Sequence, residues 1–393
     1  MVVVLVNLFM IIFNQLLLNY YVSDQTDMSC GCFGSPSSQK KKNSTPSLRE
    51  VEGQLLENIR QFSYNELRVA TDNFNLSNKI GRGGFGIVYK GILKGGLQAA
   101  VKTLSVDSKQ GLREFLSEIN TITNVRHPNL VELLGCCAEG TNRILVYEYL
   151  PNNSLDRALL GFTSDRGLLN WERRSAICLG TARGLAFLHE ELVPPIVHRD
   201  IKASNILLDT NFLPKIGDFG LAKLFPEDIT HISTRIAGTM GYLAPEYALG
   251  GHLTKKADVY SFGVLMLEII SGQSSSKANW GGSQKYLLEW VWQLYVEGRV
   301  LEIVDSEMGE YPEGQVIRCI IIAFFCTQGA ANKRPSMRQV VEMLSRKTRL
   351  NEKQLTAPGF FLDNSDSREK TSVGSSTLHF SSAPITVTDV SPR

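Results

Sequence analysis

The octapeptide His198-Arg199-Asp200-Ile201-Lys202-Ala203-Ser204-Asn205 determines how this sequence is interpreted. It places a carboxylate, Asp200, and an amide, Asn205, in one loop with Lys202 between them. Phosphoryl transfer needs a carboxylate that orients the attacking hydroxyl, and it needs cations that offset the charge on the moving phosphoryl group. The spacing therefore predicts a phosphoryl-transfer loop in which Asp200 orients the hydroxyl, Asn205 binds magnesium and Lys202 reaches the γ-phosphate.

Two segments upstream supply the phosphate contacts that such a loop requires. Residues 81–88 have the sequence Gly-Arg-Gly-Gly-Phe-Gly-Ile-Val and continue as a strand, whereas a dinucleotide-binding turn would open a helix. Lys102 follows in the next apolar strand, expected over residues 97–104, and can hold the α- and β-phosphates of ATP. Its expected partner is Glu118, in an amphipathic helix expected over residues 112–125.

Two segments downstream complete the set. Asp218-Phe219-Gly220 offers a second magnesium ligand in Asp218, and Ala244-Pro245-Glu246 closes residues 218–246, the activation segment. The five motifs occur in order and together resemble the eukaryotic protein kinases. The resemblance implies an α+β fold of two lobes, a small β-rich N-lobe with one key helix and a larger helical C-lobe, with ATP bound between them. The expected catalytic residues are Lys102, Glu118, Asp200 and Lys202.

Further stretches resemble the plant receptor-like kinases of the Pelle and interleukin-receptor-associated kinase group. They are residues 62–67, 70–74, 145–149, 152–156, 238–246 and 333–337. The resemblance leaves no room for an extracellular sensor domain, so the layout is similar to a receptor-like cytoplasmic kinase of the cold-responsive type. We expect a helical extension over residues 62–73, capped by Ser63 and Glu66, an N-lobe and hinge over 74–150 and a C-lobe over 151–347.

The resemblance also assigns the nucleotide site. The glycines of the hairpin cover the phosphates, three apolar side chains enclose adenine, the hinge backbone at Glu148 and Leu150 binds its edge, and Tyr147 is the gatekeeper that narrows the back pocket. The residues expected to bind ATP are Gly81, Arg82, Gly83, Gly84, Phe85, Gly86, Val88, Ala100, Lys102, Tyr147, Glu148, Leu150 and Leu207. Magnesium is the expected metal, held by Asn205 and Asp218, with manganese as an alternative.

Specificity and regulation follow from the same loop. Tyrosine kinases usually lack a lysine at the position of Lys202, so the resemblance favours transfer to serine or threonine.

Arg199 precedes the catalytic aspartate and is expected to need an anion, which phosphorylation of the activation segment would supply. The candidate phosphosites are Thr230, Ser233, Thr234 and Thr239. We favour Ser233 and Thr234, because Thr239 should instead contact Asp200 and Lys202.

Other matches predict structural contacts. Glu246 should pair with Arg334 in the C-lobe, and Asp258, which opens an apolar helix over residues 259–270, should accept hydrogen bonds from the catalytic-loop backbone. Four side chains should stack between the lobes, namely Ile122, Leu133, Phe219 and His198.

Composition gives weaker constraints. A net charge of +2 provides no whole-chain argument for nucleic acid, and we expect no such partner. The seven cysteines are unevenly spread, which is not typical of a secreted disulfide framework, and those in apolar stretches are expected to be buried free thiols. A reducing, cytosolic setting fits this pattern.

The N-terminus leaves three interpretations open. Residues 1–27 begin with an apolar stretch that approaches the length of a membrane span, and the lysines at 40–42 would then favour a cytosolic kinase. Alternatively, residues 1–27 are an upstream extension and the protein starts at Met28, where Cys30 and Cys32 are acylation candidates beside the lysines. The third is a disordered, unmodified tail. Either membrane interpretation places the kinase at the cytoplasmic face of the plasma membrane.

The remaining expectations concern tails, partners and rival functions. Residues 28–61 should be an anchor and linker, and the Ser/Thr-rich residues 348–393 a disordered tail. Expected partners are protein substrates and an upstream membrane receptor kinase.

A scaffold without activity is disfavoured because the three residues that such proteins usually lose are all present, namely Lys102, Asp200 and Asp218. A small-molecule phosphotransferase is disfavoured because the activation segment is complete.

Overall fold

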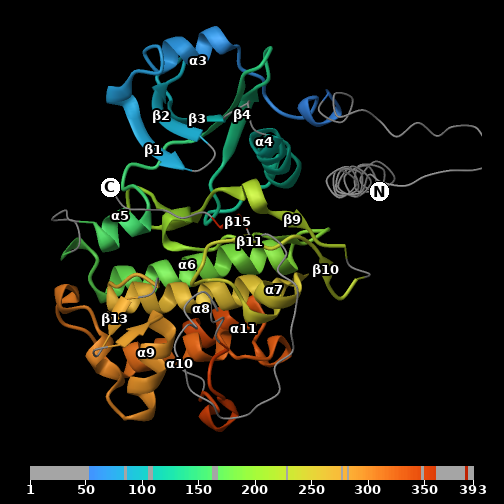
Figure 1. Cartoon of the computed structure of the whole chain (residues 1–393). Coiled ribbons are helices and arrows are strands. Elements are labelled where there is room, and N and C mark those ends of the chain that lie inside the picture. Colours follow the sequence, from blue (N-terminus) through green and yellow to red (C-terminus); the bar gives the residue numbers. More distant parts are fainter. Residues whose placement is uncertain are drawn as a thin grey trace, which may run out of the picture.

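The computed structural model describes residues 53–83, 86–104, 109–161, 167–226, 229–275, 278–280, 283–346, 349–359 and 386–387. The chain forms a smaller lobe rich in strands and a larger lobe rich in helices, one above the other (Figure 1). The expected two-lobe α+β architecture is confirmed. Gly84, Phe85, Cys30 and Cys32 lie outside the described residues, as does the apolar stretch at the N-terminus.

The N-lobe is built on a five-stranded antiparallel sheet in the order β1-β2-β3-β5-β4. Its strands are β1 (Lys79–Gly83), β2 (Gly86–Ile92), β3 (Gln98–Leu104), β4 (Leu133–Cys137) and β5 (Arg143–Glu148). The helix α4 (Lys109–Ile122) packs against β3 and β5. This helix ends earlier than expected, and Asn124 just beyond it has φ 67°, a left-handed conformation that a helix cannot continue through.

The expected N-terminal extension covers another part of the sheet. Its helix α3 (Tyr64–Ala70) starts after Ser63, whose hydroxyl accepts a hydrogen bond from the Glu66 backbone N–H at 3.1 Å. Phe62 donates its backbone N–H to the Cys136 carbonyl at 2.8 Å, and both Phe62 and Leu67 are buried against the sheet. The packing of Leu55, Leu56 and Ile59 against the core shows that the expected linker ends before residue 61.

The C-lobe is organised around one nearly fully buried helix. It contains α5 (Leu155–Leu160), α6 (Trp171–Glu190), α7 (Pro245–Gly250), α8 (Lys255–Ser271), α9 (Leu287–Val296), α10 (Glu313–Cys326) and α11 (Met337–Ser345). The buried helix is α8, which packs against α6, α9 and α10. It begins before the expected apolar run because Thr254 caps it, accepting from the Lys256 N–H, so Asp258 lies in its first turn rather than at its start.

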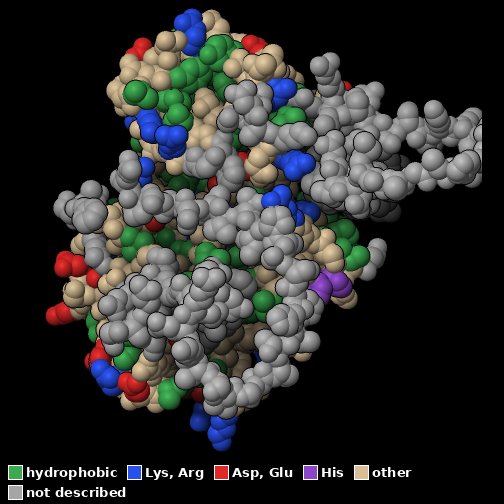
Figure 2. Space-filling model, viewed as in Figure 1, with side chains coloured by type: hydrophobic (Ala, Val, Ile, Leu, Met, Phe, Trp, Pro, Cys, Tyr) green, Lys and Arg blue, Asp and Glu red, His purple; other side chains and the backbone are tan. Residues whose placement is uncertain are grey.

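Among the described residues, five short strand pairs lie outside the N-lobe sheet. They are β6 (Ile196–Val197) with β9 (Lys223–Leu224), β7 (Ile206–Leu208) with β8 (Pro214–Ile216), β10 (Ile232–Ser233) with β12 (His252–Leu253), β11 (Ala237–Gly238) with β15 (Thr386–Val387), and β13 (Ala278–Trp280) with β14 (Ser283–Lys285). The β10–β12 pair joins the activation segment to the chain entering α8. Histidine side chains are exposed beside β10 (Figure 2), where the His231 and His252 rings lie 5.0 Å apart.

The expectation of a disordered tail from residue 348 is wrong for residues 349–359. Tyr260 donates its hydroxyl to the Gly359 carbonyl at 2.6 Å, and Gln328 binds both the backbone and the hydroxyl of Thr356. Leu350 and Leu355 also pack against the core, so buried polar groups and apolar contacts fix this segment on the C-lobe. The same expectation is contradicted at β15, which pairs with the activation segment.

The expectation of buried free thiols was met within the described part of the chain. Its cysteines, namely Cys136, Cys137, Cys178, Cys319 and Cys326, are free and buried. The described helices include none that is both long and apolar enough to cross a membrane.

Candidate active site

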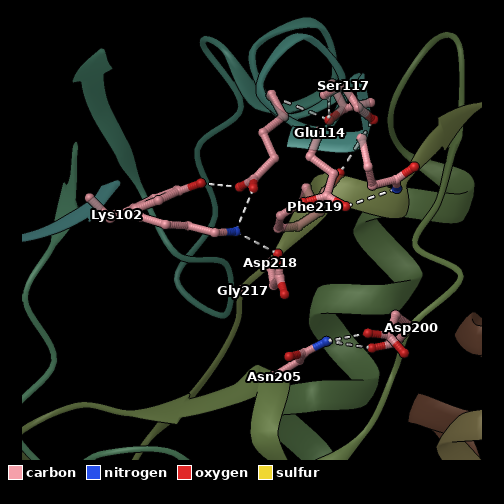
Figure 3. Close-up of polar contacts among 12 residues, drawn as sticks. Lys102, Glu114, Ser117, Asp200, Asn205, Gly217, Asp218 and Phe219 are labelled. Carbon is pink, nitrogen blue, oxygen red and sulfur yellow. Dashed lines mark hydrogen bonds and ion pairs between the residues drawn. The ribbon is translucent and has the colours of Figure 1, made fainter. Parts of the chain in front are cut away.

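One ion cluster joins the two lobes. The Lys102 ammonium group lies 2.7 Å from Glu118 Oε1 and 2.8 Å from Asp218 Oδ1 (Figure 3). Lys102 comes from β3, Glu118 from α4 and Asp218 from the start of the activation segment. The expected lysine–glutamate pair is therefore present, and it already includes the aspartate expected to bind metal.

The charges in this cluster support one another. Burial alone would lower the pKa of Lys102, but the carboxylates of Asp218 and Glu118 outweigh it and raise the pKa well above its usual value. Burial likewise opposes ionisation of Asp218, yet the Lys102 charge holds the pKa of that carboxyl below its usual value. Lys102 is therefore a fixed cation in the cleft, as binding to polyphosphate requires.

Two further contacts hold α4 against this cluster. Tyr147 donates its hydroxyl to Glu118 Oε2, so the expected gatekeeper also fixes the second oxygen of the paired glutamate. Ser117 donates its hydroxyl to the Ala222 carbonyl at 3.0 Å, which ties the helix to the beginning of the activation segment. Together these contacts keep Glu118 directed at Lys102.

A second cluster surrounds the catalytic-loop carboxylate. Asp200 Oδ1 accepts from the Thr239 hydroxyl at 2.7 Å, and Asp200 Oδ2 lies 2.9 Å from Lys202 Nζ and 3.1 Å from Asn205 Nδ2. Lys202 Nζ also donates to the Thr239 hydroxyl at 2.9 Å. The contacts expected of Thr239 are therefore present. They connect the catalytic loop to the end of the activation segment.

Asp258 supports the catalytic loop from below. Its carboxylate accepts the backbone N–H groups of His198 at 2.7 Å and Arg199 at 2.8 Å, and His189 Nε2 at 2.8 Å. Arg199 has φ 71°, and Asp218 has φ 62°. Left-handed backbone is costly in non-glycine residues and persists only where surrounding contacts hold it. The expected hydrogen bonds from the catalytic-loop backbone to Asp258 are thus present, and one of them comes from Arg199, whose backbone is left-handed.

Two of the four side chains expected to stack between the lobes, His198 and Phe219, are in direct ring contact. His198 and Phe219 have ring centroids 4.8 Å apart at 67°, and His198 Nε2 lies 3.0 Å from the Gly217 carbonyl. Ile122 and Leu133 are buried in the same core. The position of His198 favours the structural role expected for it.

Arg199, which is expected to need an anion, already has neutral hydrogen-bond partners. Its guanidinium donates to the Tyr247 hydroxyl and to the carbonyls of Leu221 and Arg235, at 2.6 to 3.2 Å. These acceptors were not foreseen because they come from distant parts of the activation segment and from α7. All three acceptors are neutral, so the guanidinium is hydrogen-bonded without an opposite charge among the residues that the structure describes.

The candidate phosphosites have different surroundings. Thr234 accepts a hydrogen bond from Lys223 Nζ at 3.1 Å, whereas Ser233 is exposed in β10 opposite His252. Thr230 is also exposed, and its hydroxyl lies 3.2 Å from His231 Nδ1. Burial, together with the nearby charge of Arg199, lowers the pKa of Lys223 to about 8. Lys223 was not identified from the sequence, because nothing in its spacing distinguishes it from a surface lysine.

The residues expected around adenine lie on adjacent strands. In the sheet register, Val88 is opposite Lys102 and Ala100 is opposite Tyr147, while Leu207 comes from β7 in the other lobe. Glu148 ends β5, and Lys215 holds its carboxylate at 2.7 and 3.0 Å, a contact the sequence did not indicate. These positions are consistent with an adenine site between the lobes.

Gly86 of the hairpin is needed for packing, in addition to its expected role of covering the phosphates. A Cβ on Gly86 would lie 1.9 Å from the Thr103 carbonyl oxygen, so no other residue fits without moving the backbone. A Cβ on Gly81 would meet only Val88, at ordinary contact distance. Gly86 is therefore required by the β2–β3 pairing itself.

The donors in the cleft suit magnesium. Asn205 uses its amide nitrogen to bind Asp200, both at the backbone carbonyl and at the carboxylate, which leaves the amide oxygen directed elsewhere. Asp218 uses Oδ1 for Lys102, and its side chain is 37% exposed. Oxygen donors of this kind are what magnesium prefers. The described residues include no cluster of three or more His, Cys, Asp or Glu side chains suited to hold a metal without substrate.

Comparisons with known proteins agree with this arrangement. The family of protein tyrosine and serine/threonine kinases matches residues 74–344. Cold-responsive protein kinase 1 of Arabidopsis thaliana is 50% identical over 333 residues, which are 84% of this chain and 85% of that protein. Two probable leucine-rich-repeat receptor-like serine/threonine-protein kinases of the same plant are 53% and 54% identical over 77% and 76% of this chain. The matched part is 29% of each of those receptors. The chain belongs to the protein tyrosine and serine/threonine kinase family.

Proposed function

We propose that this protein kinase is a serine/threonine kinase of the receptor-like type, which transfers the γ-phosphate of ATP to hydroxyl groups of protein substrates. The observation that carries the proposal is the pair of clusters described above. Lys102, with Glu118 and Asp218, provides a fixed cation for the phosphates, and Asp200 lies in a separate cluster with Lys202 and Thr239. The position of Lys202 and the names of the relatives support serine and threonine as acceptors.

In this proposal Asp200 orients the substrate hydroxyl. A carboxylate offers about four acceptor positions, and three are already used by Thr239, Lys202 and Asn205. The remaining position is open to the hydroxyl. As the bond between the γ-phosphorus and ADP breaks, the substrate oxygen bonds to phosphorus and its proton passes late to Asp200. Magnesium held by Asn205 and Asp218, or manganese in its place, would offset the phosphate charge.

We further propose that phosphorylation of the activation segment increases activity, mainly through Thr234 with Ser233. A phosphate on Thr234 would lie beside Lys223, and Arg199 is nearby with only neutral acceptors among the described residues. Phosphate carries close to two negative charges and strong acceptor oxygens. It would raise the pKa of Lys223 and order the segment.

We also propose that the kinase works at the cytoplasmic face of the plasma membrane, beneath a receptor kinase. The receptor-like relatives support this location, as do Cys30, Cys32 and the lysines that follow them in the sequence. These N-terminal residues lie outside the described part of the chain. Membrane flotation of the full chain beside a Cys30→Ser/Cys32→Ser variant distinguishes acylation from a span within residues 1–27.

The experiment that tests the kinase proposal is a γ-labelled ATP and Mg²⁺ assay on the full chain beside Asp200→Asn, followed by mapping of the modified residues. We expect incorporation by the wild type alone, on serine or threonine. Incorporation on tyrosine alone would contradict the acceptor preference. ATP binding without transfer in both proteins, even after treatment with an active receptor kinase, would support a scaffold instead.

A further inference from the structure

Residues 355–359, here termed the C-terminal strap, lie beyond the part of the chain that matches the kinase family, which ends at residue 344. The strap is nevertheless bound to the C-lobe through its backbone. Gly359 donates its N–H to the Thr327 carbonyl at 3.1 Å, and Pro358 forms an antiparallel bridge with Gln328. The strap therefore runs along the loop that follows α10.

Gln328 fastens the strap with both ends of its side-chain amide. The residue is 1% exposed, so the amide has to find its partners inside the protein. Its oxygen accepts the Thr356 hydroxyl at 2.5 Å and the Thr356 backbone N–H at 3.3 Å, and its nitrogen donates to the Thr356 carbonyl at 3.3 Å. A buried acceptor that loses its donor costs free energy, so Thr356 helps to fix Gln328 in one position.

Gly359 lies where the strap meets the end of the activation segment. A Cβ at this position would be 2.8 Å from the Gly329 Cα and 2.9 Å from the Pro245 Cγ, which is closer than such atoms can approach. Pro245 is the first residue of α7. The Gly359 carbonyl also accepts the Tyr260 hydroxyl from α8 at 2.6 Å. Gly359 therefore contacts the loop after α10, α7 and α8 at one point.

The loop that the strap covers also holds Arg334. The Arg334 guanidinium donates to the carbonyls of Gln328 at 2.8 Å and Gly329 at 3.3 Å. It binds both carboxylate oxygens of Glu246 in α7 at 2.8 Å. Its Cζ lies 5.0 Å from the centroid of the Tyr260 ring. The residues that the strap contacts are thus the ones that set the position of Arg334, and Arg334 sets the position of Glu246.

The segment before α7 connects this contact to the catalytic loop. Only residues 240–244 separate α7 from Thr239, whose hydroxyl donates to Asp200 at 2.7 Å. This stretch of the activation segment is therefore held at one end by Asp200 and at the other by Arg334. A displacement of α7 would move the stretch relative to the hydroxyl that Asp200 has to orient.

We propose that Thr356 and Gly359 are positioning residues for the polypeptide substrate, which act through Arg334 and Glu246 on the end of the activation segment. The strap fixes residues 327–329, these fix Arg334, and the ion pair with Glu246 fixes α7. The inference rests on the proposed kinase function. It adds determinants of substrate binding that lie outside the part of the chain that matches the family.

The test is steady-state kinetics of the full chain, with one synthetic peptide that the wild type phosphorylates and with ATP. We expect Gly359→Ala to raise the KM for the peptide about ten-fold, because a displacement of about 1 Å far from the chemistry can cost about a hundred-fold. The KM for ATP should be unchanged, because none of the strap contacts above involves Lys102, Glu118 or Asp218. Hydrogen exchange of the α7 amides should become faster in the variant.

Matched variants separate positioning from folding. Gly314→Ala is the control for Gly359→Ala, because a Cβ at Gly314 would meet nothing within 4 Å. Thr356→Val should raise the KM for the peptide about five-fold, since it removes the hydroxyl that Gln328 accepts. Thr356→Ser keeps that hydroxyl and should restore the wild-type KM. This threonine pair decides the question if Gly359→Ala does not fold.

The outcomes distinguish the inference from the function beneath it. A wild-type KM for the peptide in folded Gly359→Ala and in Thr356→Val would overturn the inference alone. Equal increases in KM for the peptide and for ATP would also overturn it, because they indicate a general loosening of the C-lobe. If the wild type binds ATP but transfers nothing, the proposed function fails. Unchanged exchange of the α7 amides in Gly359→Ala would then overturn the positioning by the strap as a separate result.

Discussion

Tyr147 donates its hydroxyl to the carboxylate of Glu118 that also accepts the Lys102 ammonium group. Tyr147, on β5 at the expected gatekeeper position, is therefore part of the contact that holds α4 in place. Glu118 is fully buried, so each of its oxygens depends on one donor from the sheet.

Tyr147→Phe should lower kcat/KM about ten-fold. The ring still fills its place, but one buried oxygen of Glu118 loses its donor, and a hydrogen bond to a charged group contributes about 1.5 kcal/mol or more. Tyr89→Phe is the control, because Tyr89 is buried in the same lobe against Phe74 and makes no contact with Glu118. An unchanged kcat/KM for Tyr147→Phe would show that α4 is held without this bond.

Thr239→Val should lower kcat at least about ten-fold, whereas Thr239→Ser should keep most of it. The hydroxyl donates to Asp200 and accepts from Lys202, and valine has the same shape without it. Single-turnover rates with a peptide substrate separate this loss from weaker peptide binding. Equal rates for the valine and serine variants would show that Asp200 is oriented without Thr239.

Glu246→Ala should destabilise the C-lobe by about 3 kcal/mol in denaturant unfolding. The Arg334 side chain is fully buried and binds both oxygens of Glu246 at 2.8 Å, so removing the carboxylate leaves a buried charge unpaired. Glu302→Ala, which breaks the exposed pair with Arg299, is the control and should shift the midpoint far less. Similar shifts of the unfolding midpoint for both variants would show that the buried Glu246–Arg334 pair stabilises the C-lobe no more than the exposed Glu302–Arg299 pair.

The sequence predicted those parts of the site that local motifs encode. Asp200, Lys202 and Asn205 come from one loop, and the spacing of Lys102 and Glu118 on a strand and a helix anticipated their pairing. It did not predict contacts that depend on how distant segments meet. Lys223 donates to the Thr234 hydroxyl across the activation segment, and Arg199 donates to the neutral carbonyl of Arg235 in the same segment.

The errors at the edges of the fold have a similar cause. Residues 349–359 have few large apolar side chains, which predicted disorder, yet polar groups of Gln328 and Tyr260 hold them. Those partners lie in or after other helices and give no local signal. Glu114 was also missed: it is buried beside Gly220, and burial raises the pKa of its carboxyl to about 8.

Ser233→Ala combined with Thr234→Ala should lower activity more than Thr230→Ala does. Thr234 contacts Lys223, which lies near Arg199 of the catalytic loop. Thr230 instead lines a C-lobe pocket that also contains Lys255 and Lys256. Initial rates against one peptide, after equal incubation with ATP, make the comparison. Equal activity of the double variant, Thr230→Ala and wild type would contradict regulation through this segment.

Glu268→Gln should remove a pH dependence from the stability of the C-lobe. Glu268 is fully buried, where it accepts the hydroxyl of Tyr242 from the activation segment and the backbone N–H of Ser275. Burial raises the pKa of Glu268 to about 7 although these hydrogen bonds lower it. The folded protein therefore keeps this carboxyl protonated over a range in which the unfolded chain, with an ordinary pKa near 4.3, has lost the proton.

The sign follows from proton binding. Between about pH 4.5 and 7 the folded state binds more protons at this group than the unfolded state, so the wild type loses stability as pH rises and levels off above pH 7. The difference in unfolding free energy between Glu268→Gln and wild type should change by at most about 3 kcal/mol across that range. Denaturant unfolding at a series of pH values measures it, with Glu302→Gln as the exposed control. Parallel curves for wild type and Glu268→Gln would mean that Glu268 stays ionised beneath Tyr242.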